Sequence, residues 1–172
     1  MGLEGKKIAI FVADMYEDIE FWYPYYRMKE EGADVVVIGP KNGTYTGKKC
    51  LKVTADSSIK EVTPADFDGL IIPGGYAPDH IRRKFEMIDF VRKMNEEEKP
   101  IAAICHAAWV LASAGLLKNR NVTSFFSIKD DLVNAGAYWT DQEVVEDGNL
   151  ITSRNPDDLP VFCKTIIKVL SV

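Results

Sequence analysis

The stretch that decides the fold is 101–117, which reads IAAICHAAWVLASAGLL. Its first four residues, Ile101–Ile104, form a short apolar run that is typical of a strand buried on both faces. The small and apolar residues of His106–Leu117 predict a helix packed in the protein interior. Cys105 lies at the junction, so a strand, a tight turn and a helix would meet at a cysteine. Such strand–helix units build a parallel sheet that is covered by helices.

The N-terminal half repeats this alternation of strand and helix. Lys6–Ala13 is a continuous apolar run, and Ala33–Gly39 is a second one. Between them, Glu17–Glu31 carries apolar residues at helical spacing, which predicts a βαβ unit with parallel strands. Gly69–Ile72 predicts another buried strand, directly before the turn Pro73–Gly75.

The remaining segments complete the same architecture. We expect an antiparallel excursion at 44–56 and one helical turn at Thr63–Pro64. A long amphipathic helix should follow the glycine turn, with one apolar face formed by Ile81, Phe85, Ile88, Val91 and Met94. The C-terminal part should hold a short helix around Asp130–Asn134, two strands around Gly148 and a final helix Asp158–Leu170. The fold class is therefore α/β, a three-layer α/β/α sandwich with a flavodoxin-like, doubly wound and mostly parallel sheet. Residues 1–172 would form a single domain.

Charge and apolar patterning argue against several classes of partner. The net charge is −5, whereas binding to nucleic acid or to an anionic membrane surface is favoured by positive charge. The apolar runs are far shorter than the roughly 20 residues of a membrane helix. The N-terminal stretch lacks the cleavage site of a signal peptide. We therefore expect a cytoplasmic protein with no nucleic-acid partner and no membrane partner.

The cysteine and histidine content argues against metal and disulfide chemistry. Cys50, Cys105 and Cys163 are widely spaced and form no CxxC pair. Two histidines make a zinc cluster hard to assemble, so we expect no metal and no cofactor. The question that remains is whether one of the thiols is reactive.

Unusual residues follow three of the expected strands, at the edge where open parallel sheets bind ligands. A cysteine on a sharp strand-to-helix turn is similar to a nucleophile elbow, in which the following helix favours the thiolate. A small core hydrophobe is an equally good interpretation of Cys105. His106 could serve as a general acid and base, or could be an ordinary hydrogen-bonded loop histidine.

Glycines and carboxylates near these strand ends also allow two interpretations. The amides of Gly74 and Gly75 could form an oxyanion hole, although a chain reversal is the commoner use of such glycines. Glu17 and Asp18 are typical of a solvated helix N-terminus. Glu20 differs because it lies between two apolar residues. A buried carboxyl group there would stay protonated and could donate a hydrogen bond to the thiolate.

Several segments, in order along nearly the whole chain, match a known family. They are ADMYEDIEFWYPYYRMKEEG, TYTGKKCLKV, IIPGGYAPDHIR, AAICHAAWVLASAG, IKDDLVNAGAYWTDQEVVEDGNLITSR and NPDDL. On these segments the sequence resembles the ThiJ/PfpI superfamily, specifically the PfpI-type intracellular proteases that are also described as protein deglycases. The resemblance implies the fold of class I glutamine amidotransferases. Those amidotransferases carry a later histidine, and this chain has none after His106, so glutaminase activity is not expected.

The resemblance also implies roles for individual residues. Cys105 would be the nucleophile, His106 its adjacent partner and Glu20 the acidic residue that contacts the thiol. Gly75 and the amide that follows the nucleophile would form the oxyanion site.

Two positions depart from the family pattern. Asp79 stands where the family has an acidic residue that is thought to complete a Cys-His-acid triad from a neighbouring subunit. The family residue expected there is glutamate, and aspartate is one methylene shorter. Ala107, which lies at the binding site, stands in place of the usual glycine. A shared triad implies a homo-oligomer, a dimer or hexamer, and the aromatic cluster at 22–26 could supply the interface.

The function implied is that of a cysteine-dependent hydrolase acting on peptides or on glycated proteins and methylglyoxal adducts. Conversion of methylglyoxal to lactate, a small carbonyl reaction without a cofactor, is implied as well. The alternative is a redox-sensing stress-response protein or chaperone in which a low-pKa Cys105 is oxidised without turnover. A nonenzymatic binding module is the third hypothesis.

Overall fold

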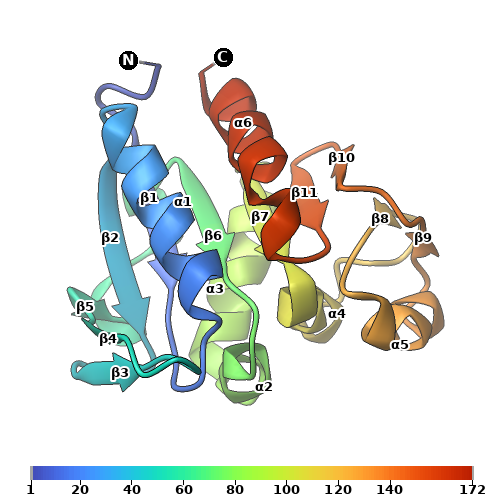
Figure 1. Ribbon diagram of the computed structural model, residues 1–172, viewed down its shortest axis with the longest axis horizontal. Helices are drawn as coiled ribbons and strands as arrows, with labels where there is room; N and C mark the ends of the chain where they lie inside the picture. Colours follow the sequence, from blue (N-terminus) through green and yellow to red (C-terminus); the bar gives the residue numbers. More distant parts are fainter. Residues whose placement is uncertain (1, 172) are drawn as a thin grey trace.

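A seven-stranded sheet runs through the middle of the protein in a computed structural model that describes residues 2–171 (Figure 1). In order across the sheet, the strands are β10 (Val144–Asp147), β11 (Leu150–Ser153), β7 (Ile101–Ile104), β6 (Gly69–Ile72), β1 (Lys7–Phe11), β2 (Asp34–Gly39) and β5 (Ser57–Ser58). Neighbouring strands are parallel except for β10 and β11, which pair antiparallel. The mostly parallel sheet of the sequence prediction is confirmed.

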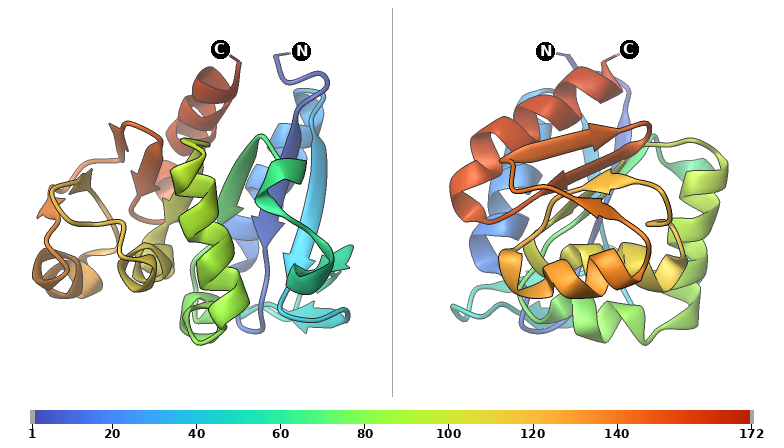
Figure 2. Two further views of the ribbon diagram at one scale, coloured as in Figure 1. Left: turned by 180° about the vertical axis from the view of Figure 1, so that it is seen from behind. Right: turned by 90° about the vertical axis from the view of Figure 1, so that its right-hand side faces the viewer.

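Helices cover both faces of this sheet. They are α1 (Asp18–Glu30), α2 (Ala77–Arg82), α3 (Phe85–Glu96), α4 (Ala108–Ala114), α5 (Lys129–Asn134) and α6 (Leu159–Leu170). The helices α1 and α6 pack together on one face and stand in front in Figure 1, whereas α3 comes to the front in the reversed view of Figure 2 and contacts α2 and α4. The three-layer sandwich is confirmed. Within residues 2–171, no helix is both long and apolar enough to cross a membrane.

The three central strands bring their carboxyl ends to one edge of the sheet. Strand β6 lies between β1 and β7, with Ile10 paired to Ile71 and Ile71 paired to Ala102. These strands are almost wholly buried because helices cover both faces, which explains their continuous apolar sequences. The segments that follow them, including Pro73–Gly75 and Cys105, therefore meet at this edge.

The long amphipathic helix predicted at 81–94 is instead two helices, α2 and α3. The backbone at Lys84 is extended, with φ −106° and ψ 111°, so the helical hydrogen-bond ladder is interrupted and α3 begins at Phe85. The break changes which residues face the core. Phe85 is 71% exposed rather than buried, and Met87 and Phe90 are buried in α3.

Two small sheets lie outside the main one. The predicted antiparallel excursion is confirmed as β3 (Thr44–Thr46) paired with β4 (Lys52–Thr54). A parallel pair, β8 (Asn121–Val122) and β9 (Tyr138–Trp139), is absent from the sequence prediction. Strands of two residues are too short to leave an alternating pattern, so periodicity could not have found them.

The loop between β3 and β4 is held against α1 by one buried carboxylate. Asp18 is 2% exposed and accepts backbone hydrogen bonds from Lys49 at 2.7 Å and from Leu51 at 3.1 Å. The hydroxyl of Tyr16 donates to the carbonyl of Leu51 at 2.7 Å. The interpretation of Asp18 as part of a solvated helix terminus was therefore wrong, because its buried carboxylate holds loop 47–51 against the start of α1.

We predict that Asp18→Ala destabilises the protein by about 2–4 kcal/mol, because two buried amide donors lose their charged acceptor. Urea unfolding measures the loss, and hydrogen exchange should show faster exchange at 47–51. The exposed Asp34 provides the matched control, and Asp34→Ala should change stability by less than about 0.5 kcal/mol. Equal effects of the two substitutions would contradict this role for Asp18.

Candidate active site

Cys105 occupies a strained backbone turn directly after β7. Its φ is +62°, in the left-handed region that residues other than glycine rarely adopt. One 3-10 turn, Cys105–Ala107, then leads into α4. The elbow that the sequence predicts is present, with a half-buried side chain at its tip. Backbone strain of this kind costs about 1–3 kcal/mol and persists only where the surrounding structure enforces it.

Several groups face the sulfur of Cys105. The Nδ1 atom of His106 lies 3.3 Å from Sγ. The backbone N–H groups of His106 and Gly75 donate toward the sulfur, and the side chain of Glu20 also interacts with it. The fold thus brings together four residues that the sequence singled out. Two backbone amides therefore converge on the sulfur.

Gly74 lies between the side chains of Glu20 and Cys105. A Cβ at this position would lie 2.5 Å from Oε2 of Glu20 and 2.7 Å from Cβ of Cys105, so only glycine fits. The N–H of Gly74 donates to Oε2 of Glu20 at 2.8 Å. The amide of Gly74 is therefore engaged by Glu20, whereas the amide of its neighbour Gly75 is directed toward the sulfur.

The neighbouring turn is held in place by the chain that follows β1. Gly75 has φ +79° and forms an antiparallel bridge with Tyr16. A Cβ at Gly75 would come within 2.5–2.8 Å of backbone atoms of Met15, Tyr16 and Glu17. The close approach of two backbones therefore requires glycine here. The bridge with Tyr16 also fixes the direction of the Gly75 N–H, which donates toward Cys105.

Glu20 is fully buried beside Cys105, and burial raises its pKa to about 7, with the backbone hydrogen bond from Gly74 as the largest opposing effect. Its Oε1 atom has no hydrogen-bond partner that meets ordinary geometry among residues 2–171. A proton located between the carboxyl group and the sulfur would satisfy both groups. The expectation of a buried, protonatable carboxyl group at this position agrees with the structure.

Burial raises the pKa of Cys105 to about 12, and the negative charge of Glu20 adds to the effect. The amides of His106 and Gly75 oppose the shift without cancelling it. Desolvation and the neighbouring carboxylate thus act against the thiolate that the start of the following helix was expected to favour. Attack by this thiol requires a base that removes its proton.

His106 is placed to be that base. Its ring stacks on Phe125 with centroids 5.3 Å apart and meets Trp109 edge-on at 5.1 Å. Burial lowers the pKa of His106, and the positive charge of Lys48 lowers it further, so the ring is neutral at pH 7. The second ring nitrogen, Nε2, lies 3.2 Å from Oγ of Ser127, a residue that no sequence pattern had singled out.

Lys48 is a second residue that the sequence prediction missed. It is carried by loop 47–51, its ammonium lies 2.7 Å from Oε2 of Glu17, and it lies over the ring of Tyr76 at 5.7 Å. Its charge also acts on Cys105, Glu20 and His106. A lysine in a surface hairpin carries no sequence signal, because only the docking of the loop brings it to the site.

Asp79 is not brought to His106 within one chain. Its carboxylate lies 3.3 Å from the guanidinium of Arg83, one turn further along. Arg83 also lies 2.6 Å from Nδ1 of His80, which keeps this histidine on the helix surface. Ala107 is fully buried beneath the elbow.

The other two cysteines lie elsewhere. Cys163 is buried in α6, and Cys50 is exposed in loop 47–51. In the part of the chain that the structure describes, no three histidine, cysteine, aspartate or glutamate side chains gather into a group that could hold a metal ion.

Comparisons with known proteins agree on one family. The model of the DJ-1/PfpI family matches residues 6–169. The deglycase PfpI of Pyrococcus furiosus is 44% identical over 164 residues, covering 95% of this chain and 99% of its own. Protein/nucleic acid deglycase 2 of Escherichia coli is 44% identical over 169 residues, with 96% and 98% covered. The crystal structure of Drosophila melanogaster DJ-1beta superposes with a TM-score of 0.91 at 31% identity, covering 96% of this chain and 90% of that one.

We predict that Glu20→Gln stabilises the protein at pH 8 but not at pH 5. A carboxyl group with a folded pKa of about 7 and an ordinary value of 4.5 contributes stability at low pH that is lost as the pH rises between these values. The loss amounts to about 3 kcal/mol, and glutamine avoids it. Thermal unfolding at both pH values measures the difference.

The exposed Glu96 supplies the control, and Glu96→Gln should change stability by less than about 0.5 kcal/mol at either pH. A Glu20→Gln variant that is less stable than the wild-type protein at pH 8 would show that the carboxylate is a net stabilising charge.

Proposed function

Because the chain belongs to the DJ-1/PfpI family and is an enzyme of the PfpI type, we propose that it is a cysteine-dependent hydrolase of peptides or of glycated proteins and methylglyoxal adducts. The observation that carries the proposal is the set of groups around one sulfur. Cys105 faces the Nδ1 atom of His106 at 3.3 Å and two backbone amides, from Gly75 and His106. This set suits attack on a carbonyl carbon.

The reaction begins with the thiol of Cys105. Sγ forms a bond to the carbonyl carbon while the thiol proton passes to Nδ1 of His106. The electron pair of the C=O bond moves to oxygen, which the amides of Gly75 and His106 stabilise. With an aldehyde, His106 returns the proton to this oxygen and gives a thiohemiacetal. With an amide, the proton goes to the leaving nitrogen, and water then hydrolyses the acyl-enzyme.

Glu20 sets the charge beside the nucleophile. When its carboxyl group is protonated, no negative charge opposes the sulfur as it loses its own proton. Its pKa of about 7 keeps a large share of the molecules in this form at neutral pH. The part we propose for Glu20 is therefore to hold a proton beside the reacting sulfur without leaving a permanent charge there.

The base that lies beside Cys105, His106 at 3.3 Å, favours an enzyme over a redox sensor. A sensor cysteine needs an accessible thiolate of low pKa. Here burial and the Glu20 carboxylate oppose the thiolate, and the neighbouring base His106 suits turnover instead. Deglycation, proteolysis and conversion of methylglyoxal to lactate all begin with the same attack on a carbonyl.

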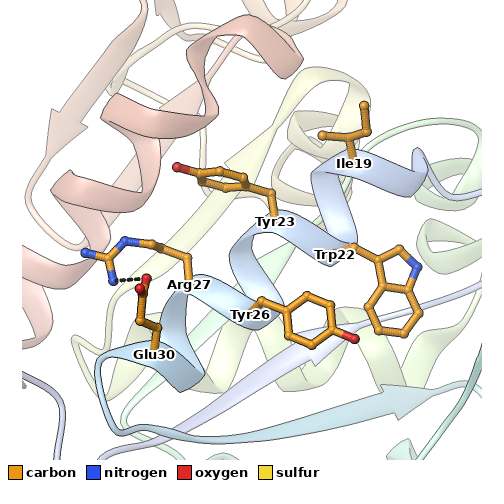
Figure 3. A pocket seen from close by; sticks show the side chains of 6 residues that line it. All are labelled: Ile19, Trp22, Tyr23, Tyr26, Arg27 and Glu30. Carbon is orange, nitrogen blue, oxygen red and sulfur yellow. Dashed lines mark ion pairs between the residues drawn. The ribbon is translucent and has the colours of Figure 1, made fainter.

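The proposed role of Asp79 is intermolecular, because within one chain its carboxylate pairs with Arg83. The outer face of α1 offers a surface for a second copy of the chain. It holds an open pocket of about 610 Å³ lined by Ile19, Trp22, Tyr23, Tyr26, Arg27 and Glu30 (Figure 3). Tyr26 is 62% exposed and Ile19 is 56% exposed, which is costly for side chains of this size unless a partner covers them. We propose a homo-oligomer in the cytoplasm.

We predict that Cys105→Ala abolishes lactate release from methylglyoxal, release of amines from glycated peptides and cleavage of fluorogenic peptides. The loss should be about a thousandfold or more wherever the wild-type protein is active, because the nucleophile is removed. Cys50→Ala is the matched control, since its thiol is exposed and outside the site, and it should keep full activity. A wild-type protein inactive in all three assays would refute the proposed function.

We predict that Tyr26→Glu shifts the protein from oligomer to monomer in light scattering, because a charge would be buried at the interface. Tyr138, which is 60% exposed at the other end of the molecule, provides the control Tyr138→Glu, with no effect on assembly. If Asp79 acts across the interface, Tyr26→Glu and Asp79→Asn should lower kcat to the same extent. A strictly monomeric and active wild-type protein would exclude a shared site.

A further inference from the structure

Both ring nitrogens of His106 have partners within the same chain. Nδ1 faces Sγ of Cys105 at 3.3 Å, and Nε2 faces Oγ of Ser127 at 3.2 Å. Within one chain, Nε2, the nitrogen that an acid would contact in a Cys-His-acid triad, therefore faces a serine hydroxyl. Ser127 lies 21 residues from His106 in sequence, on the turn that precedes α5.

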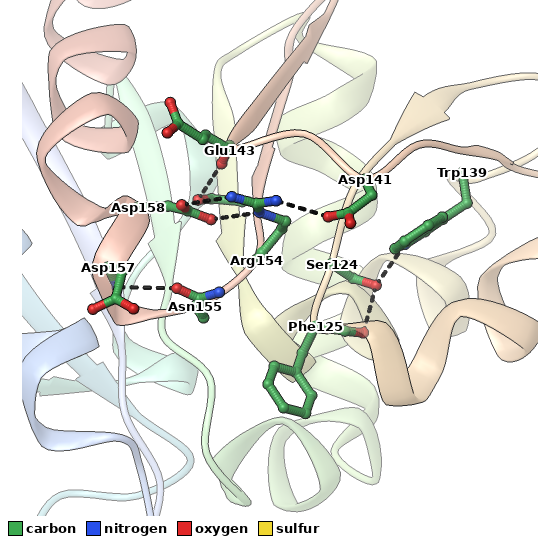
Figure 4. Close-up of polar contacts among 10 residues, drawn as sticks. Ser124, Phe125, Trp139, Asp141, Glu143, Arg154, Asn155, Asp157 and Asp158 are labelled. Atoms are coloured by element: carbon green, nitrogen blue, oxygen red, sulfur yellow. Dashed lines mark hydrogen bonds and ion pairs between the residues drawn. The ribbon is translucent and has the colours of Figure 1, made fainter.

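The turn that carries Ser127 is fixed by contacts on both sides. The indole Nε1 of Trp139 donates to Oγ of Ser124 at 3.0 Å, and Ser124 in turn donates to the carbonyl of Phe125 at 3.0 Å (Figure 4). The amide of Phe125 donates to the carbonyl of Cys105 at 3.3 Å. The elbow and the serine turn are therefore joined by the backbone next to the imidazole.

The aromatic neighbours fix the plane of the imidazole but not its proton. Phe125 stacks on one face of the ring, and Trp109 meets it at an interplanar angle of 75°. Trp109 is itself held by a hydrogen bond from its indole nitrogen to Asp131 at 2.8 Å. Neither aromatic ring distinguishes a proton on Nδ1 from a proton on Nε2. Only a hydrogen-bond partner at one of these nitrogens can select between the two tautomers.

We propose that Ser127 is a positioning residue that accepts a hydrogen bond from Nε2–H of His106 and so leaves Nδ1 free to take the proton of Cys105. A neutral imidazole carries one proton, and a base facing the sulfur needs its lone pair on Nδ1. Oγ of Ser127 accepts in this arrangement, and its own proton points to solvent, to which the serine is exposed. The proposal rests on the proposed function and explains how one chain can hold a competent base.

A hydroxyl facing Nε2 of His106 affects the charge of the ring differently from a carboxylate. A neutral acceptor orients the ring without adding negative charge, so it stabilises the imidazolium less than a carboxylate would. This agrees with the lowered pKa of His106, which has burial as its main cause. Ser127 therefore selects the tautomer and orients the ring, while its effect on rate stays modest.

The direct test is nitrogen NMR of protein labelled with ¹⁵N-histidine. The chain has only two histidines, so His80→Asn assigns the resonances of His106. We expect the wild-type protein and Ser127→Thr to show His106 protonated at Nε2. Ser127→Ala should show a mixture of the two tautomers. A wild-type His106 protonated at Nδ1, or a Ser127→Ala spectrum equal to that of the wild-type protein, would overturn the proposal.

Kinetics provide the second readout. Ser127→Ala should lower kcat about fivefold with little change in KM, the size expected for one neutral hydrogen bond, and Ser127→Thr should restore it. Ser171→Ala, which removes a hydroxyl at the far end of α6, is the matched control. The rate of Cys105 alkylation by iodoacetamide should follow the same order. Because alkylation and NMR need no substrate, they test Ser127 even if the proposed hydrolase activity fails.

Discussion

The contact between the carboxyl group of Glu20 and the thiol of Cys105 is the interaction on which the site depends. Both groups are taken out of water, and two negative charges cannot be held there together at an acceptable free energy. Burial raises the pKa of Glu20 to about 7, and a proton held between the two groups near neutral pH would relieve this repulsion. The sulfur can become an anion during reaction only if the carboxyl group remains neutral and a base accepts the thiol proton.

The surrounding fold is arranged to hold these two side chains together. The strand order β7-β6-β1 brings Cys105, the glycine turn after β6 and the start of α1 to one edge of the sheet. Gly74 fills the gap between Glu20 and Cys105 so closely that a methyl group would collide with both. The positive φ of Cys105 and the buried carboxyl group each cost stability. The extensive apolar core of the sandwich offsets these costs, as is common where function requires strain.

Much of this could be predicted from the sequence because the decisive features are local. Continuous apolar runs identify the buried parallel strands, and Cys105 directly follows one of them. Glu20 was singled out because it lies between two apolar residues in the sequence, and the family resemblance implied contact with the thiol. Ser127 and Lys48 were missed because they are ordinary polar residues of surface turns, and only long-range docking brings them to the site. The break at Lys84 was missed for a related reason, since no glycine or proline marks it.

The state of the proton between Glu20 and Cys105 can be measured directly. In protein labelled with ¹³C at the glutamate side-chain carboxyl groups, NMR follows each carboxyl resonance through a pH titration. We expect one resonance to titrate near pH 7, to disappear in Glu20→Gln, and to shift when Cys105 is replaced by alanine. If every glutamate titrates below about pH 5, the range of ordinary carboxyl groups, Glu20 is ionised throughout, and the account of a proton shared with the nucleophile is wrong.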